Sequence, residues 1–161
     1  MERMNMESPS TDQKPPSKET ILVVDDETGP RESLRMILKP IYEVHTASDG
    51  QEAHKVIQSK DIDVVTLDLN MPGLSGIETL KGIRKLKPNM EVIVITGYGT
   101  LTNAQEAIRL GAGDFISKPF NVADVISIVA KAFERRSYTL KINSLVERIQ
   151  SLRSTGNDVQ G

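Results

Sequence analysis

Residues 21–26 read Ile-Leu-Val-Val-Asp-Asp, an apolar run that stops at two adjacent carboxylates. A run of this kind is typical of a strand that is buried on both faces, as in a parallel sheet covered by helices. Further strand-like segments follow at 62–67, 92–95 and 115–117, and a more amphipathic one at 42–46. The sequence therefore predicts five strands, most of them fully buried.

Helical patterns separate these strands. Leu34, Ile37 and Leu38 recur at helical spacing before Pro40, and Asn121 opens a longer helix near the end of the chain. Three pairs at capping-box spacing predict where the second, third and fourth helices begin: Ser48 with Gln51, Ser75 with Glu78, and Thr102 with Gln105. Five strands alternating with five helices predict an α/β fold with a doubly wound, five-stranded parallel sheet.

Composition narrows the classes of function. The chain has 161 residues, 38% of them hydrophobic and 26% charged, and its formal net charge is -2. This balance is typical of a soluble globular protein, and it lacks the basic excess that indicates direct binding to nucleic acid or to an anionic membrane. No apolar stretch approaches the roughly 20 residues that span a bilayer, and no signal peptide is evident. We expect a cytoplasmic protein.

Four segments are expected along the chain. Residues 1–19 are polar and rich in proline, which predicts a disordered arm. The alternating pattern occupies 20–136, the predicted domain. Residues 137–153 carry apolar side chains at helical spacing, which predicts a helical or coiled-coil extension, and 154–161 are predicted to form a disordered tail.

Polar residues stand at the ends of four predicted strands: Asp25 and Asp26 after the first, Asp68 after the third, Thr96 after the fourth and Lys118 after the fifth. In such sheets the ligand site lies at the carboxyl ends of the strands, so these groups should share one rim. Three adjacent carboxylates repel each other unless a cation lies among them. Carboxylates without nearby histidine or cysteine favour Mg²⁺.

This arrangement predicts phosphoryl chemistry. A carboxylate such as Asp68 can attack phosphorus and form an aspartyl phosphate. The transferred group carries negative charge on its oxygens, which Mg²⁺, the Lys118 ammonium and the Thr96 hydroxyl could each contact. Gly97 lacks a side chain, so it leaves room for the group and exposes a backbone N–H.

These motifs together resemble the response-regulator receiver domain of two-component signalling. The resemblance rests on Val-Val-Asp-Asp-Glu at 23–27, on Asp68 with Met-Pro-Gly at 71–73, on Thr96, and on 115–120 with its Lys-Pro pair. It covers about residues 20 to 136. The sequences of 25–34 and of 96–99 are most similar to the corresponding segments in receivers of enhancer-binding transcription regulators.

The resemblance implies a flavodoxin-like (βα)5 fold and a set of roles. Asp68 would accept a phosphoryl group from the phosphohistidine of a sensor histidine kinase or phosphotransfer protein. Asp26 and Asp68 would bind Mg²⁺ directly together with the backbone carbonyl of Asn70, and Asp25 would help through water. The domain would not be an enzyme with a separate substrate, but would assist its own phosphorylation and dephosphorylation.

The resemblance also implies an output. Thr96 and Phe115 would be the switch pair, although Phe115 is first of all expected to be a core or half-buried aromatic. The Lys118–Pro119 bond is expected to be cis. The two histidines, His45 and His54, are not expected to be functional.

Other functions stay open beside this one. A small aspartate-nucleophile phosphohydrolase would need an acid two residues after Asp68, where Asn70 stands instead. A degenerate receiver would lack the acceptor or the lysine, and both Asp68 and Lys118 are present. The chain could also be the receiver part of a longer transcription regulator.

The predicted extension has its own pattern. Tyr138, Ile142, Leu145, Ile149 and Leu152 recur at alternating spacings of four and three, as in the seam of a coiled coil. A homodimer or a partner helix bound through 138–152 is predicted. The alternative is a single helix that folds back on the domain or frays in solution.

Overall fold

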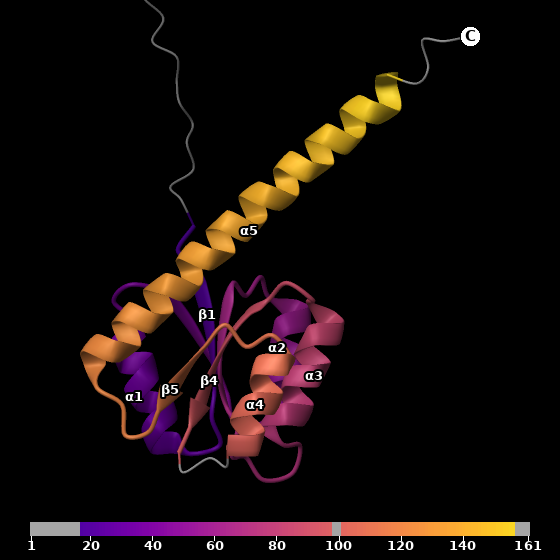
Figure 1. The fold of residues 1–161 in the computed structure, drawn as a ribbon. Coiled ribbons are helices and arrows are strands. Elements are labelled where there is room, and N and C mark those ends of the chain that lie inside the picture. The colour runs from indigo at the N-terminus through magenta and orange to yellow at the C-terminus, as the bar shows by residue number, and fades with distance from the viewer. Residues whose placement is uncertain (1–16, 98–100, 157–161) are drawn as a thin grey trace, which may run out of the picture.

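The computed structural model describes residues 17–97 and 101–156, with side chains for all of them except 101 and 102. Most of the predicted N-terminal arm therefore lies outside the described part, and so does the side chain of Thr102, so the cap predicted from Thr102 and Gln105 stays a prediction. Strands and helices alternate throughout (Figure 1): β1 (Thr20–Val24), α1 (Thr28–Leu38), β2 (Glu43–Ala47), α2 (Gly50–Ser59), β3 (Val64–Asp68), α3 (Gly76–Leu86), β4 (Glu91–Thr96), α4 (Leu101–Arg109), β5 (Asp114–Ser117) and α5 (Val122–Gly156).

The five strands form one parallel sheet in the order β2-β1-β3-β4-β5. This confirms the predicted doubly wound α/β fold. The chain moves outward from β1 to β2 and then returns to the other side of β1 to build β3, so the winding reverses between β1 and β3. Open α/β sheets bind ligands at such a reversal, beyond the carboxyl ends of the strands.

Each face of the sheet contributes to its own hydrophobic core. On β1, Ile21 and Val23 pack with residues of α1 and α5, whereas Leu22 and Val24 pack with residues of α2, α3 and α4. Alternate side chains of a strand point to opposite faces, so a strand between two helical layers must be apolar at every position. This explains the unbroken apolar run at 21–24.

One predicted helix cap is confirmed and one is wrong. Ser75 caps α3, where its hydroxyl accepts a hydrogen bond from the Glu78 N–H at 3.2 Å. The cap of α2 is Asp49 rather than Ser48: Asp49 accepts from the Glu52 N–H at 2.8 Å, and the Glu52 carboxylate accepts from the Ser48 N–H at 2.8 Å. The Asp49 and Glu52 carboxylates thus accept from the Glu52 and Ser48 N–H groups, and the capping box begins one residue later than predicted.

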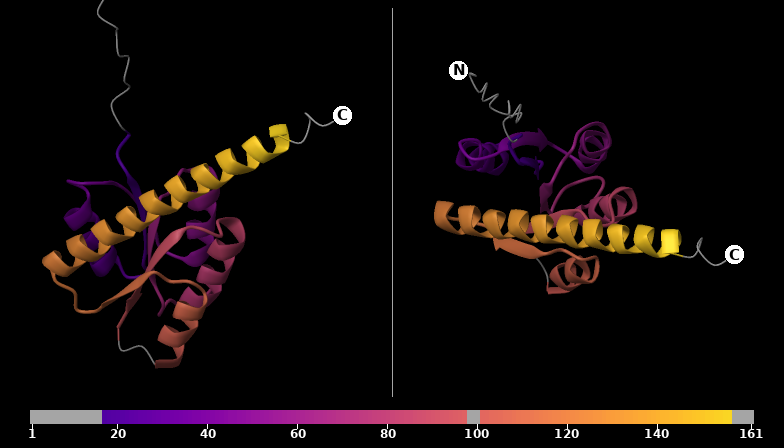
Figure 2. Two further views of the ribbon diagram at one scale, coloured as in Figure 1. Left: turned by 45° about the horizontal axis from the view of Figure 1, so that its top comes forward. Right: turned by 90° about the horizontal axis from the view of Figure 1, so that it is seen from above.

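Helix α5 continues without a break from Val122 to Gly156. Figures 1 and 2 show it crossing the domain and projecting beyond it. Its first half is anchored by Val125, Val129, Ala132 and Phe133, which are buried against the sheet. Residues 154–156 are helical, three residues further than predicted, because adding residues to a formed helix is easy once it is nucleated. Residues 157–161 lie outside the described part.

Arg84 ties α3 to the segments around it. Its guanidinium donates to the backbone carbonyls of Leu110 and Gly111 at 2.7 and 2.8 Å, just after α4. It also donates to the carbonyls of Pro88 and Met90, before β4. One side chain thus provides a hydrogen-bond donor to four backbone carbonyls. It also holds the C-terminal end of α4 against α3.

Within the described ranges, none of the helices combines the length and the hydropathy that crossing a membrane requires.

Candidate functional site

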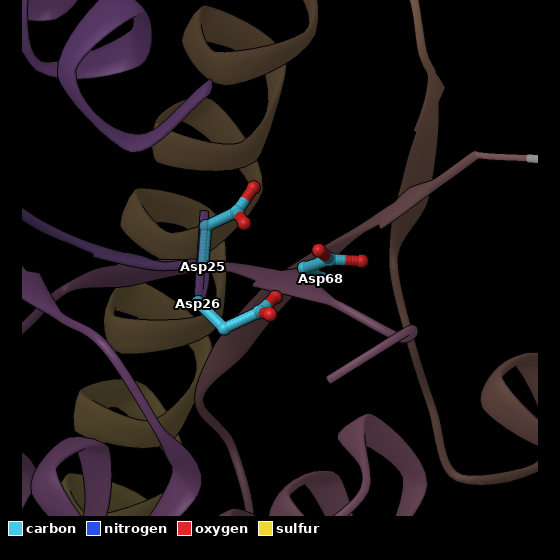
Figure 3. A group of neighbouring side chains, drawn as sticks. All are labelled: Asp25, Asp26 and Asp68. Carbon is cyan, nitrogen blue, oxygen red and sulfur yellow. The ribbon is translucent and has the colours of Figure 1, made fainter. Parts of the chain in front are cut away.

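Three carboxylates gather where β1 and β3 end. Asp25 and Asp26 directly follow β1, and Asp68 is the last residue of β3. Because β1 and β3 are adjacent parallel strands, their ends meet at the same edge of the sheet. One carboxylate oxygen from each residue lies within 4.8 Å of the others, and Figure 3 shows the three side chains side by side. The structure therefore brings together the predicted acidic cluster.

Two of these carboxylates are removed from solvent. The exposed fraction is 0% for Asp25 and 1% for Asp68. Buried carboxylates need hydrogen-bond donors, and each has one from the turn that follows it. The Glu27 N–H donates to Asp25 Oδ1 at 2.9 Å, and the Asn70 N–H donates to Asp68 Oδ1 at 2.9 Å. The turns after both strands are thus shaped around their carboxylates.

Lys118 supplies the positive charge at this rim. It follows β5, and its Nζ lies 3.0 Å from Asp25 Oδ2 and 3.1 Å from Asp68 Oδ2. The Lys118–Pro119 peptide bond is cis, as predicted. Burial acts to lower the pKa of Lys118, but its contacts with Asp25 and Asp68 outweigh burial, so the pKa is raised above its ordinary value. Lys118 is therefore a firmly protonated cation.

The pKa of Asp25 is raised above its ordinary value. Burial is the largest cause, and the negative charge of Asp68 acts in the same direction. The Glu27 N–H and the Lys118 ammonium oppose this shift without cancelling it. Three carboxylates share the Lys118 ammonium in the described part of the site, so the site favours an additional cation.

Asp26 supports the same conclusion from its geometry. Its Oδ1 is buried, and it has no hydrogen-bond partner in the described part of the chain. A buried carboxylate oxygen without a donor is costly unless a cation approaches it. Oxygen ligands from three carboxylates, with no described histidine or cysteine in the cluster, are the donor set that Mg²⁺ prefers. The residues present fit a divalent metal ion of this kind.

Thr96 and Phe115 lie on adjacent strands next to this rim. Both line a cavity of about 380 Å³ that α4 bounds with Ala104 and Ile108. Phe115 has an exposed fraction of 56%, so the expectation of a core or half-buried aromatic is wrong. In the edge strand β5, Ile116 points into the core. Phe115, the residue before it, therefore points to the opposite face, where it lines the cavity and stays exposed.

Gly97 and Asn70 complete the set of predicted residues. Gly97 follows β4, and a Cβ on it would lie 3.8 Å from Asn70 Nδ2. Asn70 is exposed after β3, with its N–H bound to Asp68. The loops after β3 and β4 therefore approach each other next to Asp68.

Two residues that position the site were not foreseen. A Cβ on Gly76 would collide with the backbone of Leu69 and lie 2.6 Å from the carbonyl oxygen of Asp68, so only glycine lets α3 begin this close to the end of β3. Arg31 on α1 donates to the Asp25 carbonyl at 2.8 Å. A glycine at the first position of a predicted helix was an available signal, whereas nothing in the sequence pattern singles out Arg31.

Comparison with known proteins agrees with this geometry. Residues 21–130 match the family model of the response regulator receiver domain. The chain is 36% identical over 120 residues to sporulation initiation phosphotransferase F of Bacillus subtilis, which covers 74% of this chain and 97% of that protein. It is 33% identical to regulatory protein AtoC of Escherichia coli over 81% of this chain, but spans only 29% of AtoC.

A solved structure is similar as well. The CheY-like response regulator receiver domain protein of Methanospirillum hungatei superposes with a TM-score of 0.73 at 31% identity, over 76% of this chain and 99% of that one. A doubly wound α/β domain with an acidic cluster at its strand ends is thus the class that fold and site define. The chain belongs to the response regulator receiver domain family of two-component signalling.

Proposed function

We propose that Asp68 accepts a phosphoryl group from the phosphohistidine of a sensor histidine kinase or phosphotransfer protein, and that this switches protein contacts. The observation that carries the proposal is the position of Asp68. It lies at the reversal of the sheet, with Lys118 Nζ 3.1 Å from one of its oxygens and two further carboxylates beside it. The chemistry takes place in the cytoplasm, where such kinases supply the phosphoryl group.

The proposed transfer forms one bond and breaks one. A carboxylate oxygen of Asp68 bonds to phosphorus as the N–P bond of the phosphohistidine breaks. Lys118 is already held between Asp25 and Asp68, so its ammonium needs little movement to reach an oxygen of the incoming group. The Asn70 N–H keeps the other Asp68 oxygen in place.

The remaining groups hold charge and orient the phosphoryl oxygens. Asp26 and Asp68, the backbone carbonyl of Asn70 and, through water, Asp25 would hold Mg²⁺. The metal ion would neutralise the negative charge of the transferred group. The Thr96 hydroxyl and the Gly97 N–H would hydrogen-bond the phosphoryl oxygens from the β4 side.

The output of this switch is proposed to begin at Thr96 and Phe115. A hydroxyl drawn toward the phosphoryl group would vacate space in the cavity that both residues line, and the exposed Phe115 ring could then turn into it. The helices after these strands are α4 and α5. A change at the start of α5 could alter association through 138–152, and coupling of this kind is typically about 1 to 3 kcal/mol.

A second possibility concerns the whole protein. The match to AtoC spans 29% of that regulatory protein, which supports the alternative that this receiver is one part of a longer regulator. In both cases the chemistry at Asp68 would be the same.

The test of the proposed function is direct phosphorylation. The protein is incubated with Mg²⁺ and a small phosphodonor such as acetyl phosphate, and its intact mass is measured. We expect one added phosphoryl group that hydroxylamine and base remove, and no addition when a chelator replaces the metal. A protein that gains no hydroxylamine-sensitive group under these conditions contradicts the proposal.

A further inference from the structure

The projecting half of α5 exposes an unbroken apolar stripe. Its members are 53 to 71% exposed and lie at spacings of four, three, four and three: Tyr138, Ile142, Leu145, Ile149 and Leu152. We call these five residues the seam. Exposed large side chains are ordinary when scattered, but a continuous row along one helix indicates a surface that another chain covers.

The seam points away from the domain. Where α5 passes over the loops at the amino ends of the strands, the hollows beneath it are lined by Arg136, Leu140 and Asn143. At 3.6 residues per turn, Leu140 is about 200° around the helix from both Tyr138 and Ile142. A second helix can therefore lie along the seam without displacing the domain.

The residue types in the seam specify the kind of association. In heptad terms the spacing puts Ile142 and Ile149 at positions a, and Leu145 and Leu152 at positions d, after Tyr138 at the first d. In parallel coiled coils, isoleucine at a with leucine at d favours two strands. A trimer or tetramer favours isoleucine at d, which this seam lacks in the described residues.

We propose that the seam binds a second copy of this chain as a parallel, in-register, two-stranded coiled coil. This goes beyond the phosphoryl chemistry, because it fixes the partner, the orientation and the residues that face each other. Each seam residue would contact the same residue of the second copy. The two receiver domains would therefore lie at the same end of the coiled coil, each on the face of its helix that is opposite the seam.

The shortness of the seam does not argue against this. Isolated helices of this length are marginal in water because the first turn is costly to form. Here that turn is already formed, because Val125, Val129 and Phe133 are buried in the domain and the helix runs on without a break. Only pairing along the seam has to stabilise the dimer.

The flanking positions give the proposal a signature. In a parallel pair, position g of one helix lies next to position e of the other, five residues on. This brings Arg148 against the second copy's Arg153, and Lys141 against the second copy's Val146. Like charges across the interface oppose association, so the dimer should be weak at low salt and should tighten as salt screens the two arginines.

The first test measures self-association of the full chain by sedimentation over a wide concentration range. Leu145→Asp should weaken the dimer by about a hundredfold or more, because pairing would bury an unpaired carboxylate. Ser144→Asp is the matched control: it adds the same charge one residue away, at an exposed position c outside the seam. It should leave the dimer nearly unchanged.

The second test reads the orientation. The chain has no cysteine, so Ile149→Cys can form a disulfide only between copies. In the parallel dimer the two sulfurs face each other within disulfide range. In an antiparallel pair centred on Leu145 the two positions would be about 12 Å apart along the axis, which is too far. Ser144→Cys should not cross-link.

The third variant tests the charge signature. Arg153→Glu would place a carboxylate beside the second copy's Arg148, so it should tighten a parallel dimer and make salt weaken rather than strengthen it. In an antiparallel pair e faces e and this gain is absent.

Three outcomes overturn the proposal: a chain that stays monomeric at the highest concentrations, Ser144→Asp as disruptive as Leu145→Asp, or a dimer in which Ile149→Cys does not cross-link. None of them affects phosphorylation of Asp68, so failure here is distinguishable from failure of the proposed function.

Discussion

The acidic rim and the seam depart from the usual distribution of residues in opposite ways. At the rim, Asp25 and Asp68 are charged and buried, whereas along the seam Leu145 and Ile149 are apolar and exposed. Each arrangement is unfavourable in the isolated domain, the first through desolvation and the second through contact with water. Each becomes favourable when something binds: a cation and a phosphoryl group at the rim, a second helix at the seam.

The two regions also differ in what holds them in place. At the rim, Asp25 and Asp68 are fixed by hydrogen bonds and by Lys118, and they cannot move away from it without breaking ion pairs. Within the described ranges, the seam is held by the helix that carries it, which is anchored through Phe133 and its neighbours. A rigid site suits chemistry that needs aligned atoms, and a projecting one suits a surface whose partner arrives from solution.

The largest expected effect separates the nucleophile from its surroundings. Asp68→Asn should abolish phosphorylation by acetyl phosphate while leaving the fold nearly intact, because an amide cannot act as the nucleophile. Intact-mass measurement with Mg²⁺ checks it. Asp61→Asn, which changes an exposed aspartate outside the cluster, should be labelled like the wild-type chain. Stoichiometric labelling of Asp68→Asn would refute the assignment.

The next effect distinguishes the two halves of α5. Phe133→Ala removes a buried ring that stacks on Tyr42 with 4.3 Å between centroids, and it should lower the free energy of unfolding by about 3 to 5 kcal/mol. Ile149→Ala, at concentrations where the chain is monomeric, should change it by no more than about 0.5 kcal/mol. Urea unfolding followed by circular dichroism measures both. Equal losses would mean that the projecting half packs on the domain.

Metal binding should be visible as stability. Because Mg²⁺ would bind the folded rim and not the unfolded chain, a free concentration of about a hundred times its dissociation constant should add roughly 2.7 kcal/mol. Without metal, Asp26→Asn should be more stable than the wild-type chain, since it removes charge repulsion, and it should respond less to Mg²⁺. Thermal melts with Mg²⁺ or chelator test this, with Asp61→Asn as a control. A wild-type melt that ignores Mg²⁺ contradicts the metal site.

The smallest effect is a pH dependence of stability without metal. The pKa of Asp25 is raised in the folded domain, mainly by burial, from an ordinary value of 3.8. The folded state therefore holds this proton more tightly, and stability falls as the pH rises from about 3.8 through the folded pKa. Lys118 is protonated in both states over this range and adds no slope.

Asp25→Asn removes the titrating group and tests this sign. The difference in unfolding free energy between Asp25→Asn and the wild-type chain, measured in chelator, should shift in favour of the variant as the pH rises through that window. A difference that is flat, or that shifts the other way, would show that burial does not control this carboxyl.

Sequence reasoning located the rim well because strand ends are easy to find. The apolar runs before Asp26, Asp68 and Thr96 mark where each strand stops, and parallel strands bring those ends together. The environment of Phe115 was missed for a physical reason: which face of an edge strand is covered depends on how closely α4 packs, and no local pattern records that distance.

The cap of α2 and the end of α5 show the limit at helix ends. Ser48 and Asp49 are both good caps, and in the structure Asp49 accepts the capping hydrogen bond while Ser48 donates its N–H to the Glu52 carboxylate. Residues 154–156 have modest intrinsic helix propensity, yet they continue a helix that is already formed. Boundaries depend on small energy differences, whereas the presence of each element depends on large ones.

Arg84 has a consequence for how α4 can respond to events at Thr96. Its hydrogen bonds to the Leu110 and Gly111 carbonyls pin the C-terminal end of α4 to α3. A helix fixed at one end cannot slide as a whole, and any displacement of it has to be a swing about that end. The residues displaced most would then be those at the start of α4, close to the carboxyl end of β4. Arg84 thus places the fixed end of α4 far from the acidic cluster and the movable end close to it.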